Sequence, residues 1–311
     1  MVVRPLPEAL QKIAIEELNE DPKRVEADLA AFKEWILQQP HLKARMDDQF
    51  LIAFLRGCKY SLEKAKAKLD NFYTLREKYP DLLKRPNLED PKVRELLKLG
   101  IVLYLPEPLT ESGPRLVLVR NGAYDPSQVS FGEVAQLRQL ISDIVMMEDD
   151  YAVISGIIFI MDFSQVGASH LFQVSPSVMR KVSQYSEQAL PFRIKASHFI
   201  DTPSGFEPVF NLIKPLLPEK IQNRLYVHGG KREELFKIIP KKFLPKDYGG
   251  ESKSIQELID YWEEKMLSYM EFYKEENQFG VDESKRIKEE TTNPPETSMG
   301  LVGSFRKLVV D

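Results

Sequence analysis

The chain has 311 residues, and its 47 acidic and 43 basic side chains leave a formal net charge of −4 at pH 7, which argues against a protein that coats nucleic acid. The 17 Phe, 12 Tyr and 2 Trp supply bulky core material, so a disordered or collagen-like chain is excluded. Cys58 is the single cysteine, which excludes an internal disulfide framework and a cysteine-rich metal site and fits a reducing compartment.

The first 85 residues predict a domain of packed helices. The chain starts with charges and two prolines where a signal peptide needs an apolar core. Apolar residues recur at helical spacing in residues 8–18 and 23–39, and two aspartates start another apolar segment over residues 47–57. Ser61 is the expected N-cap of the helix that follows. Amphipathic helices this short must pack on one another or on a second domain.

From residue 86 the pattern changes to strands that alternate with helices. Strands are predicted at residues 115–120, 156–163, 193–200 and 225–228, and helices at residues 131–147, 176–189, 204–214 and 255–274. The segment 156–163 is apolar on both faces, which is typical of a central strand. Strands joined by helical crossovers of this length predict an α/β fold with a largely parallel sheet.

Two further stretches concern the membrane and the end of the chain. The longest apolar run, residues 151–161, has about half of the roughly 20 residues that a transmembrane helix requires. Any membrane contact is therefore expected to be peripheral. Residues 289–298 are polar and contain two prolines, and we expect them to be flexible.

The sequence carries few signs of an enzyme. It has no Gly-x-Gly-x-x-Gly, no phosphate-binding Gly-Lys-Ser/Thr loop, no His-Glu-x-x-His and no Gly-x-Ser-x-Gly. The histidines His41, His170, His198 and His228 lie far apart in the sequence, and we expect them to be structural. A triad assembled from distant loops, with a serine and a carboxylate beside His170 or His198, is the alternative that the sequence leaves open.

Basic residues recur between residues 180 and 246. This segment has thirteen Lys and Arg against six Asp and Glu, so it carries a net +7 and the rest of the chain −11. Strand alternation places Arg193 and Lys195 on one face, and Lys220 and Arg224 are four residues apart on a helical turn. They are either separate solvated charges or a surface for an anionic membrane, where each basic residue contributes on the order of 1 kcal/mol.

The segment 204–214 lies between these two pairs of cations. Ser204 and Glu207 have the spacing of a capping box, and the residues that follow form an apolar stripe at helical spacing. This stripe either packs permanently on the sheet or forms a mobile lid over an apolar cavity, where it can also lie on a membrane.

Several long motifs occur here in a fixed order. They are Asp48-Gln-Phe-Leu-Ile-Ala-Phe-Leu-Arg-Gly-Cys-Lys-Tyr60, Leu190-Pro-Phe-Arg-Ile-Lys-Ala-Ser-His-Phe-Ile200, Ile213-Lys-Pro-Leu-Leu-Pro-Glu-Lys220, Val227-His-Gly229 and Leu244-Pro-Lys-Asp-Tyr-Gly-Gly250. With them the chain resembles the CRAL-TRIO lipid-transfer family, in its tocopherol- and retinaldehyde-carrier branch. The resemblance covers almost the whole chain and includes its ending, residues 303–311.

The resemblance implies a binding site for one hydrophobic molecule, such as a tocopherol or a retinoid, with no other cofactor. It implies phosphoinositide binding by Arg193, Lys195, Lys220 and Arg224. It implies a gate that contacts the membrane through Phe206, Val209, Phe210, Leu212 and Ile213. The ligand cavity that it implies involves Leu140, Asp143, Ile157, Met161, Phe172, Val174, Val182, Ser186, Leu190, Phe192 and Ile194.

We therefore predict an N-terminal helical domain over residues 1–85, an α/β lipid-binding domain over residues 86–276 and a partly flexible extension over residues 277–311. The predicted protein is a monomeric, cytoplasmic carrier that visits membranes peripherally and moves a lipid without covalent chemistry. A lipid-sensing adaptor and a lipid-acting hydrolase are the alternative functions.

Overall fold

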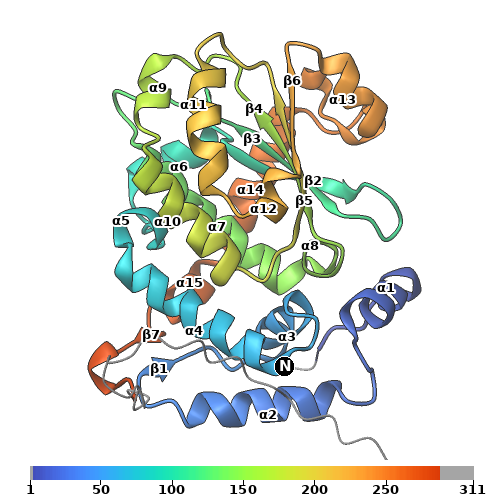
Figure 1. Cartoon of the computed structure of the whole chain (residues 1–311), viewed down its shortest axis with the longest axis vertical. Helices are drawn as coiled ribbons and strands as arrows, with labels where there is room; N and C mark the ends of the chain where they lie inside the picture. Colours follow the sequence, from blue (N-terminus) through green and yellow to red (C-terminus); the bar gives the residue numbers. More distant parts are fainter. Residues whose placement is uncertain (1–2, 288–311) are drawn as a thin grey trace, which may run out of the picture.

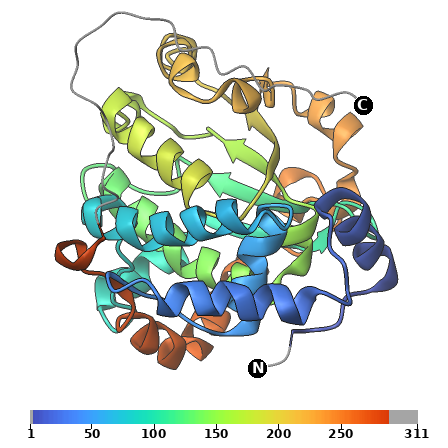
Figure 2. The same ribbon diagram turned by 60° about the horizontal axis from the view of Figure 1, so that its bottom comes forward.

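The helices that begin the chain lie together on one side of an α/β unit (Figure 1). The computed structural model describes residues 3–287. Six helices precede the central sheet: α1 (Glu8–Leu18), α2 (Val25–Leu37), α3 (Asp48–Gly57), α4 (Leu62–Lys78), α5 (Pro80–Leu83) and α6 (Pro91–Lys98). Figure 2 shows α2 and α4 side by side in front of the sheet. The predicted N-terminal helices are therefore confirmed, although the Ser61 side chain makes no capping hydrogen bond to α4.

The central sheet has five strands in the order β2-β3-β4-β5-β6. They are β2 (Val102–Pro108), β3 (Arg115–Arg120), β4 (Ile157–Asp162), β5 (Ile194–Ile200) and β6 (Leu225–Gly229). The strands β3 to β6 run parallel, while β2 pairs antiparallel with β3. The predicted α/β fold with a largely parallel sheet is confirmed. The edge strand β2 was not predicted, because its prolines resemble those of a connecting loop.

The remaining helices pack around this sheet. They are α7 (Phe131–Glu148), α8 (Asp150–Ile154), α9 (Ala168–Phe172), α10 (Pro176–Gln188), α11 (Phe206–Ile213), α12 (Glu219–Gln222), α13 (Arg232–Ile238), α14 (Ile255–Ser268) and α15 (Met270–Glu276). A capping box of Ser130 and Glu133 starts α7, and Ser175 caps α10 through the backbone N–H of Val178. No helix within the described residues is both long and apolar enough to cross a membrane.

Two predicted helices differ from the structure. The helix predicted at residues 255–274 is interrupted at Tyr269, whose N–H donates to the carbonyl of Met266 in a tighter turn. The gate helix α11 begins at Phe206 instead of Ser204, because the N–H of Phe206 closes a turn onto the carbonyl of Pro203. The capping box predicted for Ser204 is therefore wrong, and no side chain caps α11.

A short two-stranded sheet joins the N-terminal helical part to residues that follow α15. Leu42–Lys43 (β1) pairs antiparallel with Gly280–Val281 (β7). Beside it, Arg286 donates to both carboxylate oxygens of Asp70 at 2.7 and 2.8 Å. The residues after α15 thus complete the N-terminal helical part. The predicted flexible residues 289–298 and the family-like ending at 303–311 lie outside the described residues.

Buried charges connect the helical part to the α/β part. Asp143 of α7 accepts from Arg76 of α4 at 2.9 Å and from Arg85 in the connection that follows α5. Arg85 also contacts Glu276 of α15 at 2.6 Å, and Glu276 pairs with Arg45. Burial alone would raise the pKa of Asp143, but the adjacent Arg76 and Arg85 lower it below its ordinary value. This carboxylate therefore stays ionised in the interior and connects elements that are far apart in the sequence.

The stability of this connection is testable with Asp143→Asn. The variant removes the carboxylate that pairs with Arg76 and one of the two that pair with Arg85. It is expected to lower the free energy of unfolding at pH 7 by about 3–5 kcal/mol, measured by urea denaturation. Because the folded pKa of Asp143 is depressed, the stabilisation is present above the unfolded pKa of about 3.9 and is lost as the pH falls through the folded value. The difference between wild type and variant should therefore narrow in acid.

A matched control is Glu95→Gln, which removes the exposed ion pair with Lys98. Its expected effect is below about 1 kcal/mol. Equal stability of Asp143→Asn and the wild type at pH 7 would contradict the structural role given to Asp143.

Candidate functional site

An apolar cavity of about 220 Å³ lies between the sheet and helices α7, α9, α10 and α11. Its floor includes Val119 of β3, Met161 of β4 and Phe199 of β5. The strand register pairs Val119 with Met161 and Met161 with Phe199, so the three side chains form one row across the same face of the sheet. Val134 and Ala135 of α7 line one wall.

Helix α11 forms the roof of the cavity. Phe206, Val209, Phe210 and Ile213 line it from above. The Phe206 ring packs edge-on against Phe163 at 4.8 Å between centroids, and the Phe210 ring packs against Phe199 at 5.4 Å. Aromatic contacts of this kind contribute about 0.5–1.5 kcal/mol each beyond the area that they bury. The roof is therefore attached to the floor by contacts that can form, break and form again.

The structure distributes the gate residues over both sides of α11. Leu212, which was grouped with them, does not line the cavity and is 60% exposed on the outer side of the helix. Phe172, predicted for the cavity, is 86% exposed at the end of α9. Its neighbour Leu171 lines the cavity instead, and its side chain lies close to Gly205 at the start of α11. Exposed apolar side chains thus flank the roof from two helices.

The other predicted cavity residues fall into three groups. Met161, Val174 and Val182 line the cavity. A second group does not line the cavity: Leu140, Ile157, Ser186, Leu190, Phe192 and Ile194. Of these, Leu140 and Ile157 are buried in the core around the sheet, and Leu190 and Phe192 pack against the hydrophobic cores. Asp143 is engaged by Arg76 and Arg85 and differs from the prediction, because its side chain faces the helical part.

Sequence reasoning missed the polar side chains in the wall. They include Asn121, Tyr124, Arg138 and His170. Arg138 lies within the helix predicted at residues 131–147, where a single arginine resembles any exposed helix residue. A signal was present, since it falls among the apolar residues that face the sheet.

The histidines are engaged in contacts within the fold. His170 Nε2 lies 2.9 Å from the carbonyl of Tyr124, and its Nδ1 lies 3.2 Å from the backbone nitrogen of Gly167, so both ring nitrogens have partners. His198 Nδ1 lies 2.9 Å from Nε2 of His228. Burial, followed by the neighbouring His228, lowers the pKa of His198 to about 4. Within residues 3–287, no hydrogen bond joins His170 or His198 to a serine or a carboxylate.

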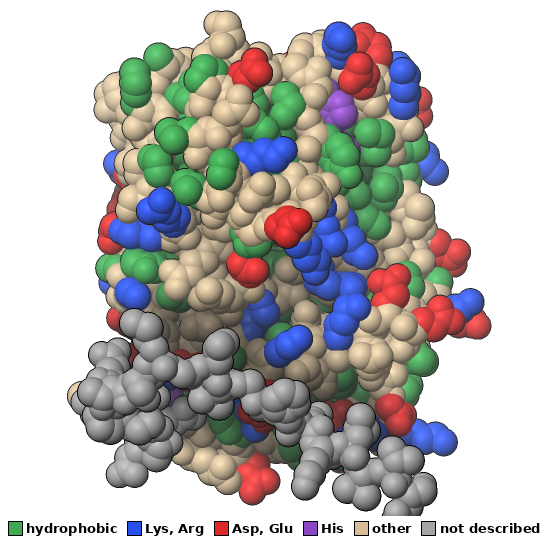
Figure 3. Space-filling view, viewed as in Figure 1, with side chains coloured by type: hydrophobic (Ala, Val, Ile, Leu, Met, Phe, Trp, Pro, Cys, Tyr) green, Lys and Arg blue, Asp and Glu red, His purple; other side chains and the backbone are tan. Residues whose placement is uncertain are grey.

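Three of the four predicted phosphoinositide residues are brought together at the start of β5. Burial lowers the pKa of Arg193, as does Arg224, while burial, Arg193 and Arg224 lower that of Lys195. Arg224 donates to the carbonyl of Ile194. Lys220 is exposed one turn before Arg224, on α12. Figure 3 shows Lys and Arg side chains gathered over this part of the molecule.

This basic cluster has one carboxylate beside it. Glu17 of α1 lies 3.7 Å from Arg193 and 3.8 Å from Lys195, beyond hydrogen-bond distance for either. Its side chain is half exposed. Two nitrogens of Arg193, Nε and Nη2, are buried and have no hydrogen-bond partner among the described residues. The cluster therefore has unused capacity to donate to an anion.

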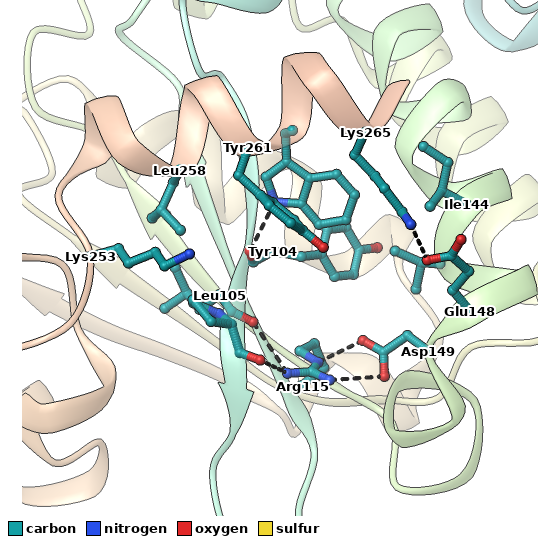
Figure 4. A pocket seen from close by; sticks show the side chains of 13 residues that line it. Tyr104, Leu105, Arg115, Ile144, Glu148, Asp149, Lys253, Leu258, Tyr261 and Lys265 are labelled. Carbon is teal, nitrogen blue, oxygen red and sulfur yellow. Dashed lines mark hydrogen bonds and ion pairs between the residues drawn. The ribbon is translucent and has the colours of Figure 1, made fainter. Parts of the chain in front are cut away.

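A second pocket, between β2, α7 and α14, has a different character (Figure 4). Arg115 pairs with Asp149 at 2.6 Å, and Lys265 pairs with Glu148 at 2.6 Å. The remaining cation, Lys253, lies over the ring of Tyr261. The charged side chains of this pocket are thus already paired with one another or stacked on a ring, which leaves no free charge there, among the described residues, to bind a polar ligand.

An apolar cavity under a short helix is typical of a protein that binds a hydrophobic molecule. The family model of the CRAL/TRIO domain matches residues 100–250, and that of the Pinta-like UBA domain matches residues 21–93. The chain is 31% identical over 246 residues to the alpha-tocopherol transfer protein-like protein of Homo sapiens, covering 79% of this chain and 71% of that one. The chain belongs to the CRAL-TRIO family of lipid-binding and lipid-transfer proteins.

The chain is also similar to two clavesins and to one solved structure. Clavesin-2 of Rattus norvegicus is 25% identical over 278 residues, which cover 89% of this chain and 83% of that one. Clavesin-1 of Rattus norvegicus is 28% identical over 246 residues, which cover 78% and 68%. The crystal structure of Sfh5 superposes with a TM-score of 0.48 at 10% identity, over 82% of this chain and 92% of that one.

The cavity can be tested by filling it. Val182→Trp places an indole in the wall and is expected to weaken binding of the neutral dye Nile red roughly tenfold, the effect of losing about 1.4 kcal/mol of apolar contact. Fluorescence titration measures this affinity. Val227→Trp, at a position that is 47% exposed on β6, is the control and should bind the dye like wild type. Equal dye affinity of both variants would show that the dye does not enter this cavity.

Proposed function

We propose that this protein is a carrier that extracts one hydrophobic lipid from a membrane and releases it at another, without covalent chemistry. The observation that carries the proposal is the apolar cavity whose roof, α11, is attached by apolar contacts alone among the described residues. Tocopherols and retinoids are candidate ligands from the resemblance, and the similarity to the human alpha-tocopherol transfer protein-like protein supports the tocopherols.

The outer side of the roof supports membrane contact. Leu212 and Phe172 are 60% and 86% exposed beside the cavity. Burying such side chains in the interfacial region of a bilayer is favourable by about 25 cal/mol per Å² of apolar surface. Insertion at this point would leave the roof facing hydrocarbon on both sides, so that opening it exposes no apolar surface to water.

The basic cluster supplies the second part of the proposal, the binding of a phosphoinositide by Arg193, Lys195, Lys220 and Arg224. Glu17 occupies the position of an anion beside Arg193 and Lys195 without forming a short hydrogen bond to either. A phosphate carries more charge and more acceptors than a carboxylate, so it would displace Glu17 and free α1 from the cluster. A lipid that binds the open-roof state better than the closed state would then favour release of the cargo.

The two alternative functions make different predictions. A hydrolase needs a serine and a carboxylate beside His170 or His198, and the hydrogen bonds of both rings go to other groups. A lipid-sensing adaptor would load the same ligand but would not move it between membranes. Transfer of a fluorescent tocopherol between two vesicle populations by the purified protein supports the carrier, and loading without transfer supports the adaptor.

The role of Glu17 gives a prediction in both directions. Glu17→Gln is expected to strengthen binding to vesicles that contain phosphatidylinositol bisphosphate, and Lys195→Glu to weaken it, each by several-fold at low salt. Cosedimentation with the vesicles measures both. The matched control Lys98→Glu makes the same change of net charge on α6, away from the basic cluster. It should weaken vesicle binding less than Lys195→Glu does. Weaker binding by Glu17→Gln would contradict the proposal.

The apolar contacts are tested separately. The double variant Phe172→Asp with Leu212→Asp is expected to lose binding to uncharged phosphatidylcholine vesicles while it still takes up Nile red in solution, because neither side chain lines the cavity. Tyr261→Asp, at a residue 46% exposed on α14, is the control. Unchanged vesicle binding by the double variant would place the membrane contact elsewhere.

A further inference from the structure

Arg138 is a cation in the wall of the apolar cavity, and it has no hydrogen-bond or ion-pair partner among residues 3–287. Its side chain comes from α7 and keeps part of its surface open where it lines the cavity. Among residues 3–287 it forms no side-chain hydrogen bond and no ion pair. Among the described residues, Tyr104 is the titratable group whose charge would affect the pKa of Arg138. Burial raises the pKa of Tyr104, so this phenol is neutral at physiological pH and supplies no negative charge.

The other buried charge of α7 cannot neutralise Arg138. Asp143 is five residues further along, about 140° around the helix axis. It faces Arg76 and Arg85, which occupy both of its oxygens. The pocket in Figure 4 shows the usual arrangement, in which Arg115 and Lys265 each have a carboxylate. Arg138 therefore differs from the paired interior arginines of this protein.

The cavity supplies no anion of its own. Among the residues that the structure describes, the lining contains no Asp and no Glu, and its second charged residue, Lys214 at the end of α11, is also a cation. A guanidinium that is enclosed without a counter-ion is unfavourable unless something else provides one. Burial lowers the pKa of Arg138, but an arginine keeps its proton in a protein, so the positive charge remains.

We propose that the cavity takes an amphiphile with one hydrocarbon chain and an anionic headgroup, a carboxylate or a phosphate, that pairs with Arg138. This assignment rests on the carrier function proposed above and adds the class of its ligand. The guanidinium fork matches both kinds of headgroup, since each presents two oxygens side by side. The cavity volume of about 220 Å³ is below the roughly 300–1,000 Å³ of sites for drug-sized ligands, which favours a single chain over a two-chain phospholipid.

The test compares three ligands with the same hydrocarbon chain: oleate, oleyl phosphate and oleyl alcohol. With the full chain, we expect one or both anions to bind roughly tenfold or more tightly than the alcohol, as a charge-assisted hydrogen bond requires. The tighter of the two anions identifies the headgroup. Displacement of Nile red at concentrations below micelle formation measures all three affinities.

Variants assign the preference to the residue. Arg138→Met should abolish the preference for the anion and leave the affinity for oleyl alcohol unchanged, while Arg138→Lys should retain part of the preference. Lys214→Met removes the other cation of the cavity and should keep the preference. The Tm of unliganded Arg138→Met should equal or exceed that of the wild type, because an unpaired buried charge is removed; a purely structural role for Arg138 predicts a lower Tm.

The outcomes separate this assignment from the carrier function. Equal binding of the three ligands by the wild type, or an anion preference that survives in Arg138→Met, overturns the assignment and leaves the carrier proposal intact. Failure of the wild type to bind any of the three, and Nile red as well, overturns both proposals.

Discussion

Helix α7 places two charged side chains in the interior, Asp143 and Arg138. The ion pairs of Asp143 fix the position of α7 between the N-terminal helices and the cavity. Asp143 is paired with Arg76 and Arg85, so the side of α7 that faces the N-terminal helices is fixed by ion pairs. On the other side, α7 forms a wall of the cavity. A buried ion pair is expensive to break once one partner is removed, because the remaining charge keeps its cost of desolvation. One helix thus holds the two parts of the molecule in place and also places the Arg138 side chain in the wall of the cavity.

Rigid and movable elements are separated by the kind of contact that holds them. The frame combines ion pairs with a core that includes Phe50, Phe54 and Phe72 from the helical part and Tyr185 from α10. The roof helix α11 has eight residues and no side-chain cap, and it rests on aromatic rings. Segments with few polar anchors open at lower free energy than the core does. The weak, apolar contacts of α11 therefore support the hypothesis that residues 204–214 form a mobile lid.

Local patterns predicted most of the fold, whereas the site depended on contacts between distant residues. The strand at 115–120 and the helix at 8–18 were found over the residues that their periodicity indicated, because both depend on neighbours along the chain. Asp143 was expected to line the cavity, and nothing within its own helix indicates that it forms ion pairs with Arg76 and Arg85. Arg138 was missed because a lone arginine in a helix resembles an exposed residue, although the apolar residues at helical spacing around it indicated the face toward the sheet. The resemblance located the cavity, but individual side chains had to be placed by the structure.

The pairing of β1 with β7 also affects how the protein can be made. Leu42–Lys43 meets Gly280–Val281, and Arg45 meets Glu276, so the helical part obtains its last strand and a buried counter-charge from residues that leave the ribosome more than 200 positions later. During synthesis the first helices must wait, with Arg45 paired only to the neighbouring Asp47, until Glu276 and nearly the whole chain have emerged. Contacts between such distant residues slow folding, since the intervening chain must be ordered first. The N-terminal part is therefore completed last although it is translated first, and a chaperone that shields nascent helices has most to protect in this interval.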